Sequence, residues 1–249
     1  MKRSAALVCT VLATAALVAG CSSSGSPARH GGTGTGASTG ATALAGRIDA
    51  ALGTLTSAHL DIDTGALGGT STADLVLQDG NASATEIHVT ESGTAVEVVT
   101  VGTTAWVKLP NGSAKPWVLV SPTSSNPIAK ALATEPGVTD ALTSLSTIAG
   151  LVRHAQDVSD MGTDATGHRY AMKIIPGKGT GNAKLDSLLS ILGNNPIATD
   201  IWLDTKNRPV KVQLDIAFGG SQFPVTVVVS KLNAPLTITA PPADAISSG

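Results

Sequence analysis

One cysteine stands where its thiol could react. Cys21 follows a segment that begins with Lys2 and Arg3, continues as an apolar run over residues 5–19 and ends in small residues. A cationic start, a short apolar stretch and small residues before a cleavage point are the layout of a secretory signal. The sequence therefore predicts removal of residues 1–20, which leaves Cys21 as the first residue and the only thiol of the mature chain.

The residues around this thiol indicate what it carries. Val18-Ala19-Gly20-Cys21 resembles a bacterial lipobox, which implies transfer of diacylglycerol to the Cys21 thiol and cleavage before it. An uncleaved membrane anchor and an ordinary signal peptide are the alternatives. However, an apolar run of about 15 residues falls short of the roughly 20 that span a bilayer, and an ordinary signal does not need this cysteine. Two or three acyl chains hold a protein on a membrane. We therefore expect a lipid anchor on the extracytoplasmic face of the cell membrane.

Composition limits the remaining classes. The chain has 249 residues, of which 42% are hydrophobic, 2% aromatic and 14% charged, so its core must be aliphatic. Loss of Lys2 and Arg3 leaves 14 basic residues against 18 acidic ones, a net charge of −4. Nucleic-acid binders carry a basic face, so we predict no nucleic-acid partner. The length that remains suits one domain.

Other residues whose side chains could bind ligands or react lack the spacing of a phosphate, metal or catalytic site. Gly177-Lys-Gly-Thr-Gly181 lacks the Gly-Lys-Ser/Thr ending of a phosphate loop. Asp61 and Asp63 share a strand face without further ligands at metal spacing, and the five histidines form no His-x-x-x-His or His-Glu pattern. No order of serine, histidine and aspartate supports a catalytic triad. We predict no metal, no cofactor and no enzymatic activity, with a hydrolase as the least favoured alternative.

Periodicity predicts the elements. Residues 22–42 are rich in Gly, Ser and Thr and predict a flexible tether, whereas Leu44, Ile48, Leu52 and Leu55 form one helical stripe. Alternating segments about ten residues apart favour an antiparallel sheet. These strands are expected at 58–63, 72–79, 86–90, 94–101, 104–109, 117–120, within 153–175, and at 200–204, 210–216 and 224–232. Further helices are expected at 126–152 and 184–192, and the tail from Pro235 should run extended and fray.

The three tryptophans are notable because aromatic residues are so rare in this chain. Trp106, Trp117 and Trp202 are each open to two interpretations, a structural anchor or a ligand contact. Trp202 falls on the strand face of Asp200 and Asp204, opposite Ile201. We favour the structural interpretation for any one of them.

Several of these features occur together in an order that resembles the actinobacterial LppX/LprA/LprF/LprG lipoprotein family, over about residues 44–242. They are the lipobox, the tether, Thr56-Ser-Ala-His-Leu60, Trp106 and Trp117, Ile201-Trp-Leu-Asp204 with Arg208-Pro-Val-Lys-Val-Gln-Leu214, Val227-Val-Val-Ser-Lys-Leu232, and Ile238-Thr-Ala-Pro-Pro242. The resemblance implies an α+β fold similar to LolA-type carriers, in which a strongly curved antiparallel sheet, a half-open β-barrel, is covered by helices on its concave face. It implies an apolar cavity that holds the acyl chains of lipids or glycolipids, and it brings no catalytic motif.

The resulting hypothesis divides the chain into a signal peptide (1–20), acylated Cys21 with a tether (21–43) and one lipid-binding domain (44–249). It makes the protein a membrane-anchored carrier that binds and transfers lipid, with an envelope transporter as a candidate partner. Residues 185–192 either line the cavity or fill the core. The candidate cavity residues are Leu75, Leu77, Ile87, Val89, Trp106, Leu142, Leu145, Ile148 and Leu188. The alternative is a structural or partner-binding envelope lipoprotein with a filled core, which would expose an apolar patch instead.

Overall fold

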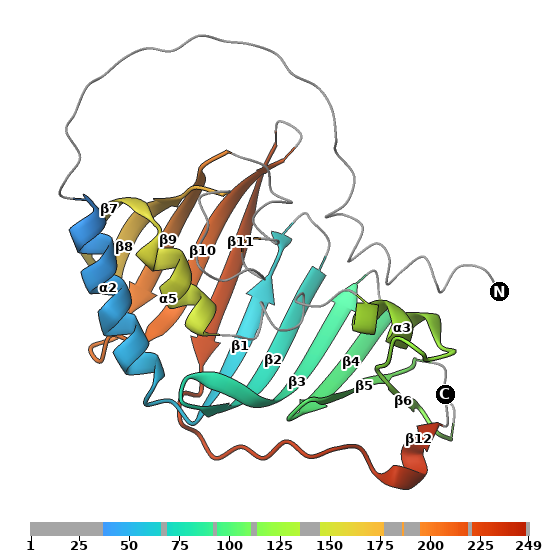
Figure 1. Cartoon of the computed structure of the whole chain (residues 1–249). Helices are drawn as coiled ribbons and strands as arrows, with labels where there is room; N and C mark the ends of the chain where they lie inside the picture. The colour runs from blue at the N-terminus through green and yellow to red at the C-terminus, as the bar shows by residue number, and fades with distance from the viewer. Residues whose placement is uncertain are drawn as a thin grey trace.

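The computed structural model describes residues 37–65, 69–91, 94–110, 114–134, 145–176, 186, 195–218 and 221–247. Within them, twelve strands form one open, twisted sheet in the order β12-β6-β5-β4-β3-β2-β1-β11-β10-β9-β8-β7 (Figure 1). Neighbouring strands are antiparallel, except that β12 and β6 run parallel. The predicted α+β architecture, an antiparallel sheet with helices packed on one face, is confirmed.

Along most of the chain, consecutive strands are joined by short connections. Their bounds are β1 (Ser57–Asp63), β2 (Gly69–Gln78), β3 (Asn81–Glu91), β4 (Thr94–Val101), β5 (Thr104–Lys108), β6 (Trp117–Leu119), β7 (Gln156–Thr163), β8 (His168–Ile174), β9 (Ile197–Leu203), β10 (Pro209–Phe218), β11 (Ser221–Ser230) and β12 (Ile246–Ser247). The described helices are α2 (Ala37–Leu52), α3 (Pro127–Thr134), α5 (Ser146–Arg153) and the 3-10 helix η2 (Ala243–Ala245). Among the described residues, no helix combines the length and apolar character needed to cross a membrane.

Helix α2 begins earlier than the sequence indicated. It starts at Ala37, so its first turns occupy residues that we expected in the tether up to residue 43. Ala41 and Ala45 are fully buried with Leu44 and Ile48, which extends the apolar stripe by one turn. Small alanine side chains complete the stripe of an amphipathic helix, although they gave no strong apolar signal in a stretch of Gly, Ser and Thr.

The predicted helical region 126–152 contains two described helices. Helix α3 begins after Asn126, whose side-chain oxygen accepts hydrogen bonds from the backbone N–H groups of Ile128 (2.9 Å) and Ala129 (3.1 Å). Asparagine before a first-turn proline is a favourable helix start. Helix α5 buries Ala149 and Val152. The predicted helix at 184–192 lies outside the described residues, apart from residue 186.

Side-chain alternation gives the sheet two different faces. The inner face, which we define as the face that contacts α2, α3 and α5, carries the main core. On β1 it presents Leu60 and Ile62, whereas His59 and Asp61 point to the opposite, outer face. Successive residues of a strand point to opposite sides, so the register of each strand decides what both faces display.

The carboxy-terminal tail is docked, in contrast to the predicted fraying. Leu236 and Ile238 pack into a second apolar cluster on the outer face with Val99 and Trp117. Figure 1 shows the red tail passing along one end of the strands before β12 pairs with β6. The Ser247 hydroxyl also donates to the Trp117 carbonyl oxygen (3.2 Å). Burial of these apolar side chains holds the tail against the sheet. The prolines of this segment had predicted only an extended, frayed terminus.

Candidate functional site

The inner face is an apolar surface that extends across most of the sheet, from β6 to β8. Direct cross-strand neighbours such as Leu60, Ala73 and Ile87 belong to one core cluster. One such row reads Val118, Val107, Val98, Ile87, Ala73, Leu60 and Val229 from β6 to β11. Cross-strand pairs of this kind are the unit of sheet stabilisation, and here they also form a wall made almost wholly of aliphatic side chains.

A second row on the same face is less completely covered. It runs Val96, Val89, Ser71, Ile62, Val227, Val212, Ile201 and Tyr170 from β4 to β8. Val89, Val96 and Val227 are only partly buried, although they pack against the main core. Aliphatic side chains in the middle of the sheet therefore retain surface that another apolar group could contact.

Helices α2 and α5 lie on this face towards the β7 end of the sheet, and α3 lies towards the β5 end (Figure 1). Polar contacts secure the rim of α2: Arg153 of α5 forms an ion pair with Asp49, and Arg47 donates a hydrogen bond to the Tyr170 hydroxyl of β8 (3.2 Å). The Arg47 guanidinium also lies 5.7 Å from the Tyr170 ring centroid. The helices therefore cover this part of the inner face. Apolar packing holds them underneath, and each exposed polar contact at their edge adds little stability.

Six of the nine predicted cavity residues lie together in this inner core. Leu75, Leu77, Ile87 and Leu145 are buried in it, and Val89 and Ile148 are partly buried against it. Leu142 and Leu188 lie outside the described residues, as does Cys21. Whether the six contact a ligand remains a prediction.

Trp106 does not share this location. It packs in the outer cluster with Ala84, Val99 and Trp117, while its neighbour Val107 is fully buried in the inner core. Because β5 is apolar at both positions, alternation could not assign the inner residue. The structure corrects the proposed cavity wall here, with Val107 in the place we gave to Trp106.

No protein-family model matches the chain, and no curated protein matches its sequence. The structure is similar to the crystal structure of LprF from Mycobacterium bovis, with a TM-score of 0.55 and 17% identity, covering 82% of this chain and 98% of that one. It is also similar to the Mycobacterium tuberculosis lipoprotein LppX, with a TM-score of 0.51 and 18% identity, covering 81% and 99%. The chain has the fold of LprF and LppX.

The sequence had missed two features of this LppX-type fold. Val96 and Val227 belong to the partly covered inner row, although their segments are apolar on both faces and alternation did not single them out. Thr85 is a buried hydroxyl residue directly opposite Leu75, and so is placed on the inner face. Apolar binding sites contain few polar groups, which orient a ligand, so a buried threonine is a candidate for that role.

Trp202 serves the outer side of the LppX-type fold. It is buried, its indole N–H donates to the Asp164 carboxylate (2.8 Å), and Lys211 and Arg169 lie 4.5 Å and 5.3 Å from its ring centroid. The indole hydrogen bond is the largest cause that lowers the pKa of Asp164, followed by hydrogen bonds from the backbone. Arg169 also forms a two-point ion pair with Asp200. These contacts tie β8, β9 and β10 together and favour the structural interpretation of Trp202.

Proposed function

We propose that this protein is a cell-envelope lipoprotein that binds the acyl chains of a lipid or glycolipid between its inner face and its helices. The observation that carries this proposal is the row of partly covered aliphatic residues, Val89, Val96 and Val227, at the centre of that face. Beside buried neighbours such as Ile62 and Val212, these positions leave aliphatic surface that an acyl chain could contact. The LppX-type fold is consistent with the proposal.

The binding would be largely hydrophobic. Each methylene transferred from water contributes about 0.8 kcal/mol, so an aliphatic wall strongly favours an acyl chain that would otherwise contact water. Such contacts have no directional preference, and the few polar groups, with Thr85 as the candidate, would set orientation. Lipid binding of this kind requires no nucleophile and no metal.

Anchoring and transfer complete the proposal. Acylated Cys21 would hold the protein on the extracytoplasmic face of the cell membrane, and the residues between Cys21 and α2 would separate the domain from the bilayer. Helices α2 and α5 would move as a cover to admit and release lipid, and the exposed ion pair Arg153–Asp49 would oppose this movement little. An envelope transporter would supply or receive the cargo.

Two adjacent valines on β11 provide a matched test. Val227 faces inward and is partly buried, whereas Val228 faces outward and is 38% exposed. Residues 22–249 would be secreted from an actinobacterial host, since a start after Ala37 would cut α2. Native mass spectrometry and lipid extraction would follow. We expect lipid at a fixed stoichiometry in the parent and in Val228→Trp, and its loss in Val227→Trp with the melting temperature retained.

The same experiment also tests the alternative, a lipoprotein with a filled core and no lipid ligand. A filled core predicts that Val227→Trp overpacks the interior, which typically costs about 1–3 kcal/mol, while all three proteins remain lipid-free. That result, together with refusal of added phospholipid or glycolipid, would replace lipid carriage by a structural or partner-binding role.

A further inference from the structure

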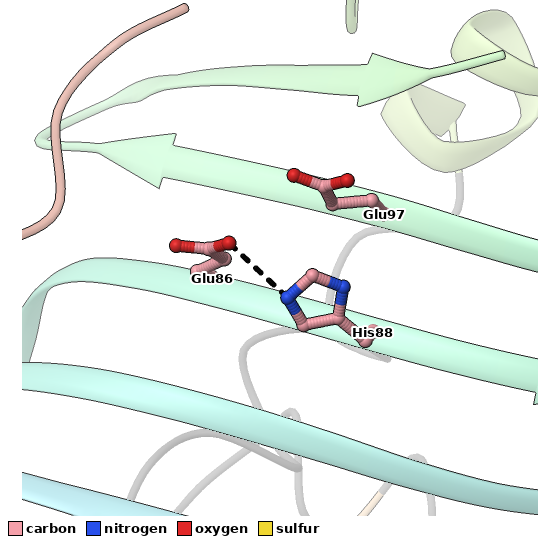
Figure 2. A group of neighbouring side chains, drawn as sticks. All are labelled: Glu86, His88 and Glu97. Atoms are coloured by element: carbon pink, nitrogen blue, oxygen red, sulfur yellow. Dashed lines mark hydrogen bonds and ion pairs between the residues drawn. The ribbon is translucent and has the colours of Figure 1, made fainter.

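Three potential metal ligands converge on the outer face of the β3–β4 hairpin. Glu86 and His88 extend from β3, and Glu97 extends from β4 beside them (Figure 2). One ligand atom from each residue lies within 4.8 Å of the other two, and His88 Nε2 is 3.1 Å from Glu86 Oε1. This group lies on the face opposite the proposed lipid site and does not depend on that proposal.

The register of the hairpin brings these residues together. Glu86 and His88 are two apart and so share one face of β3. Glu91 pairs with Thr94, and three further steps along both strands place His88 directly opposite Glu97. No spacing motif in the sequence reveals this group, because its third member comes from the next strand.

The donor set has a definite chemical preference. An imidazole with carboxylates suits divalent first-row transition metals, whereas Mg²⁺ and Ca²⁺ favour oxygen ligands alone. Ligand atoms lie about 2.0–2.2 Å from Zn²⁺, so two of them stand about 3.3–3.6 Å apart in a tetrahedral site. The present separation of up to 4.8 Å is wider than this. Small rotations of these surface side chains would close the difference and leave a fourth position for water.

Charge favours a cation at this point. Lys108 forms an ion pair with Glu97 Oε2 (2.7 Å), which neutralises one of the two carboxylates and leaves the second oxygen of Glu97 for a metal. Glu86 instead contacts His88 Nε2. With a neutral imidazole, the group of two carboxylates and one ammonium keeps one negative charge. A divalent ion would compensate that charge at little cost to an exposed ion pair.

Two other histidines contact carboxylates but lack three ligand atoms directed at one point. His59 contacts Asp74 through Nδ1 (2.7 Å) and Asp61 through Nε2 (3.5 Å), so its carboxylates stand on opposite sides of the ring. His168 contacts Asp160 through Nε2 (2.8 Å) and resembles His88 in exposure, 38% against 47%. Neither belongs to a group of three convergent ligands among the described residues.

We propose that Glu86, His88 and Glu97 form a surface binding site for a divalent first-row transition-metal ion of the Zn²⁺ type. The ion would bridge β3 and β4 across the outer face. His88 supplies the nitrogen donor, and one oxygen from each glutamate completes a three-ligand set that is open to solvent.

The test uses the full chain in detergent, with Cys9→Ser and Cys21→Ser so that no thiol competes. Zn²⁺ affinity is measured by competition with a chromogenic chelator, and Co²⁺ provides a visible spectrum of the ligand field. We expect one Zn²⁺ per chain, no displacement by excess Mg²⁺, and affinity at least about tenfold weaker in His88→Ala and in Glu97→Gln, because losing even an outer-shell partner costs that much.

His168→Ala is the matched control, since it removes an exposed imidazole paired with one carboxylate. Unchanged affinity in this variant would support the site. The proposal is overturned if the parent binds Zn²⁺ no better than His88→Ala, if His168→Ala causes an equal loss, or if Mg²⁺ displaces the bound ion.

Discussion

Replacement of Ile238 by alanine tests whether the carboxy-terminal tail is part of the folded domain. Ile238 is 9% exposed and packs with Trp117 and Val99 on the outer face. Substitution of buried isoleucine by alanine costs about 2–5 kcal/mol, depending on how well the site can collapse. Because this cluster is small and lies at the surface of the sheet, we expect the low end, about 2 kcal/mol. For a domain of this size, that loss lowers Tm by about 4–8 °C.

Thermal unfolding followed by tryptophan fluorescence is a suitable assay, because Trp117 and Trp106 lie in the same cluster as Ile238. Thr239→Ala is the control, since Thr239 is exposed in the same segment. Surface substitutions usually change stability by less than about 0.5 kcal/mol. If Ile238→Ala and Thr239→Ala lower Tm equally little, the tail contributes nothing and the reasoning from its burial fails.

Three further substitutions test local features. Gly46 is exposed within α2 and a Cβ there would meet no atom within 4 Å, so Gly46→Ala should raise the free energy of unfolding by about 0.5–1 kcal/mol in denaturant titration. A Cβ on Gly167 would lie 2.5 Å from the Leu203 carbonyl oxygen, so Gly167→Ala should lower stability by about 1–3 kcal/mol in the same titration. Burial alone would raise the pKa of Asp204, but hydrogen bonds from the Arg208 side chain and backbone outweigh it and lower that pKa below 3.8. The stabilisation is therefore present above pH 3.8 and lost as the pH falls further, so Asp204→Asn should flatten the acid limb of the stability profile.

The sheet could be predicted from sequence because alternation is a local signal. In β1 and over residues 210–216 of β10, apolar and polar residues exchange at every step, which indicates both the strand and its buried face. Asp79 and Gly80 adopt positive φ of 52° and 75° at the β2–β3 turn, and aspartate followed by glycine is typical of such hairpins. Alternation alone did not indicate the LppX-type fold, which was expected from a resemblance carried by motifs such as Ile201-Trp-Leu-Asp204 and Val227-Val-Val-Ser-Lys-Leu232.

Positions with apolar residues on both sides could not be resolved in this way. Trp106 and Val107 are both apolar, and only the packing of the tail on the outer face shows which of them points inward. The start of α2 was missed for a related reason, because the burial of Ala41 depends on what the helix packs against. The group of Glu86, His88 and Glu97 required the register of two strands. Each of these features depends on tertiary contacts, which the hydrophobic periodicity of one segment does not reveal.

Alternation also makes the two proposals separable. On β3, His88 points outward between Ile87 and Val89, which belong to the inner face. Loss of an outward imidazole should leave the inner wall intact, so His88→Ala should retain bound lipid while losing Zn²⁺. Conversely, Val227→Trp should lose lipid and keep Zn²⁺, because β11 is separated from β3 by β1 and β2 in the sheet. If either substitution abolished both ligands, general damage to the sheet would explain the result, and neither site could be assigned to the residues named here.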